Sequence, residues 1–169
     1  MHAVAEFEKV SRSVFEESCL SCFPGTDAAE IRAAYEEVRI PCRATKGSAG
    51  YDFFSPFAVT LSPGQSVTIP TGIRVKVRED WVLMIFPRSG LGFKYRMQLN
   101  NIVGVIDSDY YYSDNEGHIM IRLTNDTHDG RELLLRAGDR FVQGIFLPYG
   151  VTLSDRAENT RNGGFGSTG

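Results

Sequence analysis

The chain has 169 residues and a formal net charge of −3, and 42% of its residues are hydrophobic. This length is enough for one ordinary domain with a real core, and the negative charge argues against a nucleic-acid-binding surface, which would be basic. No apolar run approaches the length of a membrane span, and the first residues lack a signal-peptide pattern. We therefore expect no nucleic-acid partner and no membrane association.

The three cysteines are too few, and odd in number, for a secreted disulfide framework, which indicates a cytoplasmic protein. Cys19 and Cys22 have C-x-x-C spacing, but no second pair or nearby histidine completes a four-ligand zinc site. The spacing alone is weak support for a metal or redox role.

Residues 1–37 differ in pattern from the rest and are interpreted as an N-terminal extension. Apolar residues at helical spacing predict two short helices, around residues 10–15 and 31–38, separated by Phe23-Pro24-Gly25. Asp27 is suited to cap the second helix, with Glu30 three residues later. We expect this extension to pack against the body or a neighbouring subunit.

The body, residues 38–155, is expected to be all β, with no helix from residue 40 onward. The predicted strands are residues 57–61, 66–69, 73–77, 81–86, 102–106, 118–123, 132–135 and 141–147. Turn signals such as Ser62-Pro63-Gly64 separate them. Many short strands at this spacing indicate an antiparallel sandwich or barrel, of which the jelly roll is one form.

The stretch 98–123 is interpreted as two strands joined by a wide turn, with Asp107-Ser108-Asp109-Tyr110 where the first strand ends. A carboxylate at the end of a strand can be held rigidly and still face a pocket, as a general base requires. The alternative is a plain turn, because Asp and Ser also break strands.

Three further segments carry polar groups next to strands. Pro87-Arg88-Ser89-Gly90 offers a guanidinium, a hydroxyl and an accessible amide, which suit a phosphate, although a plain turn explains it equally well. Asp52, in Ala49-Gly50-Tyr51-Asp52, could help to hold a hydrated Mg²⁺ or simply occupy a turn. Arg140 and Gln143 enter the last strong strand; Arg140 could pair with Asp139 or another surface acid, whereas Gln143 is harder to explain there.

The tail, residues 156–169, is interpreted as mobile until something binds, because its last nine residues contain four glycines. Arg161 offers a charge-assisted fork for a phosphate and Phe165 an aromatic face. The glycines would let backbone amides wrap phosphates, with hydroxyls from Ser167 and Thr168. No Walker A motif is present, because no Gly-Lys-Ser/Thr occurs in the tail.

Five segments, AGYD (49–52), PRSG (87–90), NIVGVIDSDY (101–110), GDRFVQ (138–143) and RNGGFGSTG (161–169), together resemble the five ordered motifs of the trimeric dUTPases. The resemblance implies a jelly-roll-like homotrimer that hydrolyses dUTP to dUMP and pyrophosphate with Mg²⁺. It also implies that each active site is assembled from all three subunits.

By this resemblance, Asp107 is the carboxylate that activates the water attacking the α-phosphorus. Tyr110 is the ring that packs under the deoxyribose, and Asp52 is an outer-shell partner of Mg²⁺ through water. The other implied substrate-binding positions are Asn101, Val105 and Ile106 for uracil; Arg88, Ser89, Gly90 and Gln143 for the phosphates; Arg161 for the γ-phosphate; Phe165 for stacking on uracil; and Gly166, Ser167 and Thr168 for closing over the triphosphate.

Two features depart from the family pattern: the N-terminal extension, and residues 111–116, which are inserted before Gly117. Two rival functions remain open. One is a dCTP deaminase-like enzyme, which would release ammonia from dCTP. The other is a dUTPase-fold regulatory or interaction protein gated by nucleotide, with the extension and the insertion as partner surfaces. A coat or lectin-like module would leave the five motifs unexplained.

Overall fold

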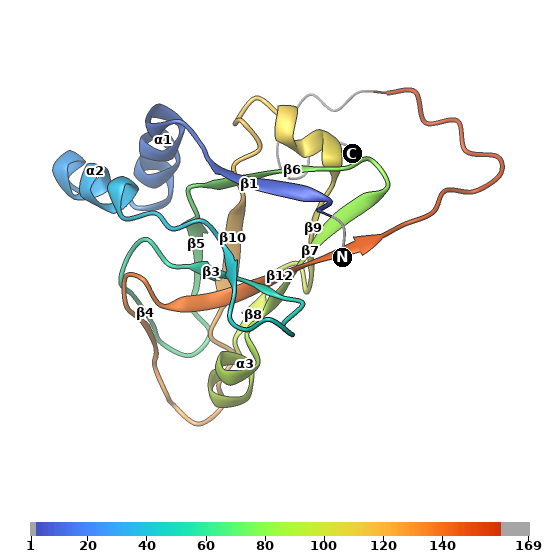
Figure 1. Cartoon of the computed structure of the whole chain (residues 1–169). Helices are drawn as coiled ribbons and strands as arrows, with labels where there is room; N and C mark the ends of the chain where they lie inside the picture. The colour runs from blue at the N-terminus through green and yellow to red at the C-terminus, as the bar shows by residue number, and fades with distance from the viewer. Residues whose placement is uncertain (1–2, 160–169) are drawn as a thin grey trace.

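The structure is a computed structural model that describes residues 3–159; the expectations for 160–169 lie outside the described residues. Its largest sheet has the strand order β2 (Cys42–Arg43), β3 (Tyr51–Phe54), β12 (Arg140–Pro148), β7 (Trp81–Pro87), β9 (Gly104–Ile106). A second sheet has the order β5 (Ser66–Pro70), β10 (Met120–Thr124), β8 (Gln98–Leu99). Two further pairs join β1 (Ala5–Lys9) to β6 (Ile73–Val77) and β4 (Val59–Leu61) to β11 (Leu133–Leu135). These pairings are antiparallel, which confirms the predicted all-β, jelly-roll-like class (Figure 1).

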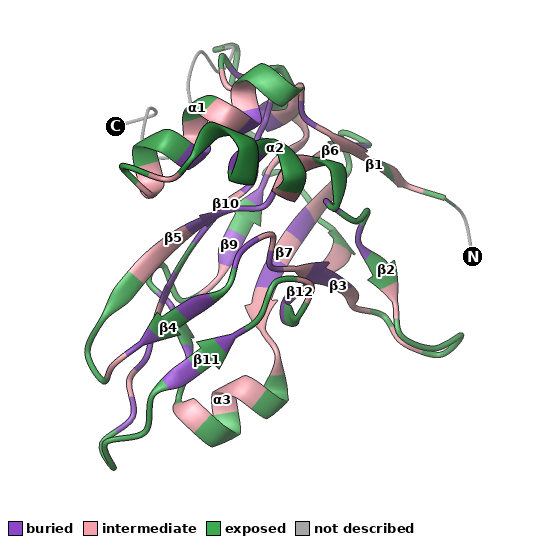
Figure 2. Cartoon of the chain, turned by 90° about the vertical axis from the view of Figure 1, so that its left-hand side faces the viewer, coloured by how far each residue is buried: buried purple, intermediate pink, exposed green. Residues whose placement is uncertain are grey.

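The core lies between the inward faces of these strands, where buried and exposed residues alternate (Figure 2). On β10, Ile121 and Leu123 are buried and Arg122 between them is exposed. Each fully buried Leu or Ile contributes about 2 kcal/mol. Gly144 lets β12 approach its neighbours closely, because a Cβ there would lie 2.8 Å from Leu83 and 3.1 Å from Phe53.

The N-terminal extension contains the two predicted helices, α1 (Arg12–Cys22) and α2 (Ala28–Glu36). Asp27 caps α2 as predicted, accepting hydrogen bonds from the backbone N–H groups of Ala29 and Glu30. Phe15 and Ile31 are completely buried, so the extension is part of the core of this chain.

Strand β1 was not predicted from the sequence. Its residues do alternate, Ala5 and Phe7 with Glu6 and Glu8, and they pair with β6 along their whole length. The Phe7 ring packs edge-on against Phe53 at 5.6 Å. The extension is therefore not purely helical as predicted.

Both cysteines of the C-x-x-C spacing lie on helix α1. Cys19 faces the core, and burial raises the pKa of its thiol to about 12; Cys22 is half-buried, and both thiols are free. A thiol with so high a pKa is unreactive at neutral pH.

None of the described helices is both long and apolar enough to cross a membrane.

The prediction that residues after 40 contain no helix is wrong. The short helix α3 (Ser89–Tyr95) follows β7, and the 3₁₀ helix η1 (Ser108–Tyr112) follows β9. Both helices begin with residues that are common in turns, such as Ser89, Gly90 and Ser108, so these segments were interpreted as turns. The same residues are compatible with the first turn of a helix.

The two strands predicted on either side of Asp107 are present as β9 and β10, but they do not pair with each other. β9 pairs with β7 in the five-stranded sheet, whereas β10 pairs with β5 and β8 in the other sheet. Apolar alternation reveals which face of a strand is buried, but it does not identify the neighbouring strand. The segment after Asp107 therefore crosses from one sheet to the other.

Candidate active site

A buried carboxylate between two arginines lies near the carboxyl end of β7. Asp52 is 5% exposed. One of its oxygens accepts from Arg88 Nε at 3.0 Å, and the other accepts from Arg140 Nη1 at 3.3 Å. The two arginine side chains remain 37% and 47% exposed. Because a guanidinium has five N–H donors, both keep donors for an anion, and the trio carries a net charge of +1.

The sheet register builds this cluster. Asp52 on β3 lies opposite Gln143 on β12, and Val142 lies opposite Pro87, the last residue of β7. Gln143 donates a hydrogen bond from Nε2 to the carbonyl oxygen of Pro87 at 3.4 Å. A Cβ on Gly50 would lie 2.5 Å from Gln143 Oε1, so a residue without a side chain leaves room for this amide.

Two cavities adjoin the cluster and share Arg88 and Ser89. One, of about 590 Å³, is also lined by Gly90, Gly138 and Arg140. The other, of about 330 Å³, is also lined by Gly50, Asp52 and Gln143. The predicted phosphate-binding residues Arg88, Ser89, Gly90 and Gln143 are thus brought together with Asp52, around a surface rich in N–H and O–H donors.

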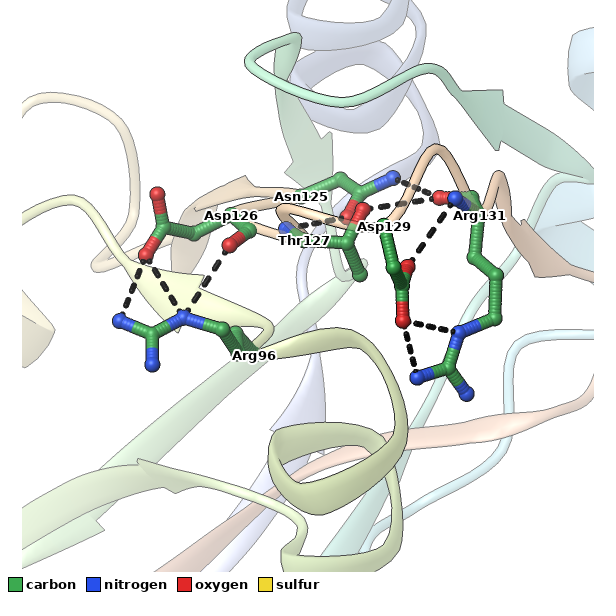
Figure 3. A network of polar contacts seen from close by, with 6 residues as sticks. All are labelled: Arg96, Asn125, Asp126, Thr127, Asp129 and Arg131. Carbon is green, nitrogen blue, oxygen red and sulfur yellow. Dashed lines mark hydrogen bonds and ion pairs between the residues drawn. The ribbon is translucent and has the colours of Figure 1, made fainter.

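Helix α3 carries Ser89 and Gly90 in its first turn and is anchored at its other end (Figure 3). Arg96 ends the helix in the left-handed region, at φ 48°, and its guanidinium binds Asp126 at 3.2 Å. Asn125, next to Asp126, donates to the carbonyl oxygens of Leu61 and Arg131 at 2.8 and 2.9 Å. The loop between β10 and β11 therefore holds the far end of α3, the helix whose first turn lines the cavity that contains Ser89 and Gly90.

A third cavity, of about 560 Å³, lies between the β8–β9 segment and β10. Its lining is Thr68, Ile85, Leu99, Asn100, Asn101, Gly104, Ile106, Asn115, Met120, Ile121 and Arg122. An apolar hollow with a few amide groups suits a flat heterocyclic base. Gly104 allows β9 to lie close to β7, because a Cβ there would be 3.0 Å from that of Ile85.

Of the predicted uracil-reading residues, Asn101 and Ile106 line this third cavity. The Val105 side chain alternates to the other side of β9 and is 47% exposed, so only its backbone is available on the cavity side.

Asp107 and Tyr110 follow β9 directly. Asp107 precedes the first residue of η1 with extended backbone (φ −75°, ψ 160°), next to Ile106 in the cavity wall. The Tyr110 ring is 1% exposed; its hydroxyl donates to the carbonyl oxygen of His118 at 2.8 Å and accepts from Asn115 Nδ2 at 3.0 Å. The hydroxyl is thus engaged inside the protein, and Tyr110 is buried and is not among the residues that line the third cavity.

The arginine cluster and Asp107 lie at opposite ends of β7, because Arg88 directly follows β7 and Asp107 directly follows β9. Leu83 pairs with Ile106, so the same register places Asp107 level with residue 82, whereas Arg88 follows the far end of the strand. At ~3.3 Å per residue, the offset from 82 to 88 is about 20 Å. This separation is longer than the three linked phosphates of one nucleotide.

Comparison with known proteins identifies the family. A model of the dUTPase family matches residues 36–169. The chain belongs to the dUTPase family. It is 42% identical over 135 residues to the deoxyuridine 5′-triphosphate nucleotidohydrolase of Lactococcus lactis, a match that covers 78% of this chain and 89% of that protein.

Solved structures of dUTPases agree with this family. The dUTPase of Streptococcus mutans superposes with a TM-score of 0.64 at 34% identity, covering 86% of this chain and 97% of that one. A mutant dUTPase from phage phi11 of S. aureus, described with a structural Mg(II) ion, has the same fold with a TM-score of 0.64 at 20% identity, covering 93% and 98%. The resemblance inferred from the five motifs is confirmed.

The dUTPase family match does not cover the whole chain. It begins at residue 36, the last residue of α2, so nearly all of the N-terminal extension lies outside it. The partnership of Arg140 with the buried Asp52 was not predicted, because Asp139 and other surface acids are nearer in the sequence or more exposed than Asp52. The predicted residues Arg161, Phe165, Gly166, Ser167 and Thr168 lie outside the described part of the chain.

Proposed function

We propose that this member of the dUTPase family hydrolyses dUTP to dUMP and pyrophosphate, by attack of water on the α-phosphorus. The observation that carries the proposal is the position of Asp107, directly after Ile106 in the wall of a cavity shaped for a base. A carboxylate at the end of a paired strand has the fixed position that a general base needs. The activity would supply dUMP and limit the incorporation of uracil into DNA.

In this proposal the two ends of β7 have different roles. Asp107 orients and deprotonates the attacking water, Asn101 and the backbone at residues 105–106 read uracil, and the Tyr110 ring supports the deoxyribose. Arg88 and Arg140 neutralise charge on the triphosphate, with Ser89, Gly90 and Gln143 as further donors. Phosphoryl transfer requires mainly such positioning and charge stabilisation. The tail residues Arg161 and Phe165–Thr168 are assigned to the γ-phosphate, to uracil stacking and to closure over the phosphates.

The residues around Asp52 fit a hydrated Mg²⁺ that is bound mainly by the substrate. Within residues 3–159, no group of three His, Cys, Asp or Glu side chains is placed to hold a metal ion directly. Both oxygens of Asp52 already accept from arginines, so this carboxylate would contact the ion through water. Mg²⁺ prefers this arrangement, because it keeps several waters and binds phosphate oxygens. When bound, it would supply positive charge to the triphosphate.

We further propose that a homotrimer completes each site. Asp107 and Arg88 of one chain are about 20 Å apart along β7, too far to serve one triphosphate. A cyclic trimer would bring the arginine cluster of one subunit to the Asp107 end of another. The tail would complete the site from a third.

The test is pyrophosphate release from dUTP, dCTP, dTTP and UTP, each with and without Mg²⁺. The expected result is rapid, Mg²⁺-dependent release from dUTP and far slower release from the others. Ammonia release from dCTP would establish the deaminase alternative instead. Tight dUTP binding without turnover would favour the regulatory alternative. The family match and the dUTP-specific name of the L. lactis relative favour hydrolysis.

A further inference from the structure

The N-terminal extension is joined to the segment that follows Asp107 by a three-residue cluster. Glu8 on β1 accepts a hydrogen bond from the Tyr111 hydroxyl at 2.9 Å. The same carboxylate binds Arg74 on β6 at 2.7 Å, and the Arg74 guanidinium lies 4.5 Å from the centre of the Tyr111 ring. Tyr111 is thus held at its hydroxyl by one element and on its face by another (η1 lies beside β6 in Figure 1).

This cluster is stabilised by charge as well as by contact. The Tyr111 hydrogen bond and the adjacent Arg74 hold the pKa of the Glu8 carboxyl below its usual range. The Glu8 and Arg74 side chains are 33% and 25% exposed, so the pair is shielded from most of the solvent. A hydrogen bond to an ionised carboxylate is stronger than one between neutral groups.

The far end of the same segment is attached to α1. The backbone N–H of Ser11, the N-cap residue of α1, donates to Glu116 at 2.7 Å. His118 is completely buried and accepts from the Gly72 N–H through Nε2 at 2.9 Å. Since a backbone N–H only donates, the proton of a neutral His118 is on Nδ1, which donates to the Ser18 hydroxyl at 3.0 Å.

Within the segment, internal contacts connect these attachments to Tyr110. The Tyr110 hydroxyl and Asn115 Nδ2 both reach the carbonyl oxygen of His118. Gly117 has φ 72°, and a Cβ there would lie 2.7 Å from Tyr111 Cα and 2.8 Å from Tyr110 O. Residues 110–118 therefore form a closed loop that is bonded within itself. If one attachment is lost, we expect Tyr110 and Tyr111 to shift together.

We propose that Tyr111, with Glu8 and Arg74, is a positioning residue that fixes Asp107 and Tyr110 for catalysis. The inference rests on the proposed function, because it concerns the residues assigned to the water and the deoxyribose. Tyr111 is in η1, the helix that Asp107 precedes, so its anchoring restricts the whole helix. The N-terminal extension and the 111–116 insertion then act together as a brace, in which Glu8, Arg74 and Tyr111 are not among the residues that line the base cavity.

Two substitutions test the brace, each with a matched control. Glu8→Ala removes the acceptor for Tyr111 and the partner of Arg74, and Tyr111→Phe removes only the hydroxyl. Glu6→Ala is the matched control on β1, since Glu6 is exposed; Tyr112→Phe is the matched control on η1, where the ring is 72% exposed. Misplacement of a catalytic group by about 1 Å can lower the rate by about 10²-fold, so for a smaller displacement we expect kcat to fall by about 10-fold.

The expected result is a fall in kcat of about that size for Glu8→Ala and Tyr111→Phe, with KM for dUTP nearly unchanged. The preference for dUTP over UTP should fall in parallel, because Tyr110 moves with the segment. Hydrogen exchange of the backbone amides of 107–113 should become faster. The double variant should have nearly the same kcat as either single variant, since both substitutions break the same hydrogen bond between Tyr111 and Glu8. Glu8→Gln retains an acceptor and should recover part of kcat.

The proposal is overturned if Glu8→Ala and Tyr111→Phe keep the kcat of the two controls, or if exchange accelerates while kcat and substrate preference stay the same. A loss of thermal stability without a change in kcat would show a purely structural role and would also overturn it. The wild-type assay separates this failure from failure of the proposed function. A folded wild-type protein that releases no pyrophosphate from dUTP contradicts the function itself, and the positioning role falls with it.

Discussion

The two ends of β7 are built in different ways. At one end, Asp52, Arg88 and Arg140 come from β3, the end of β7 and the start of β12, which are neighbours in one sheet. At the other end, Asp107 enters a loop whose supports come from the N-terminal extension and β6. The first end follows from sheet register alone, whereas the second depends on distant segments. We expect the second end to be more sensitive to changes far from the substrate.

The strongest test of the Asp107 end is Asp107→Asn. The amide keeps the shape but loses the basicity and charge, so kcat for dUTP should fall by about 10²–10⁴. Folding, followed by thermal unfolding, and dUTP binding, followed by calorimetry, should be nearly unchanged. Turnover within a few-fold of wild type would contradict the general-base role.

The next test asks whether the two ends of β7 serve different active sites. Asp107→Asn and Arg88→Ala, each expected to have little activity alone, are denatured and refolded together as mixed trimers. If each site takes Asp107 from one chain and Arg88 from another, about a quarter of the sites are complete after random mixing. Recovered pyrophosphate release at about that level is the expected result. Mixed trimers, verified by mass, with no more activity than either parent would show that both residues serve one site within a chain.

A third test uses the buried histidine of the Asp107 end. Burial lowers the pKa of His118 from 6.5 to about 4 in the folded chain. The unfolded chain therefore binds a proton at this ring more readily than the folded chain does. The contribution of the neutral ring to the free energy of unfolding is fully present above pH 6.5 and declines as the pH falls toward 4. Between pH 7 and pH 5 this linkage should lower the free energy of unfolding by about 2 kcal/mol. Urea unfolding at the two pH values measures it. His118→Gln should reduce this dependence, whereas the exposed His128→Gln should retain it.

The smallest expected effect is at the arginine end. Asp52→Asn keeps an acceptor but leaves two half-exposed guanidinium groups without a shared carboxylate, which should lower the free energy of unfolding by about 1 kcal/mol. Asp139→Asn is the control, because Asp139 is on the neighbouring loop and its side chain accepts from the backbone N–H of Arg136. Urea unfolding at pH 7 compares them. An equal effect of the two substitutions would contradict a structural role for the buried ion pairs.

Much of the fold followed from local pattern. Alternating apolar residues predicted most of the long strands, and helical spacing predicted α1 and α2, since one buried face imposes a period of about 2 or 3.6 residues. The elements that were not predicted include β1 and β3, of five and four residues, and several shorter or ambiguous ones. β2 and β8 have two residues each, too few to show a period, and α3 begins with residues that are equally common in turns.

The site divides in the same way. The sequence by itself identified the chemistry, because carboxylates, arginines and glycines in five ordered segments together resemble the motifs of the dUTPase family. The tertiary structure alone decided which groups meet: Asp52 with both Arg88 and Arg140, and Glu8 with Tyr111, 103 positions later. Local periodicity reports which side of an element is buried. Contacts between distant segments depend on strand order and register, which are set by packing of the whole chain.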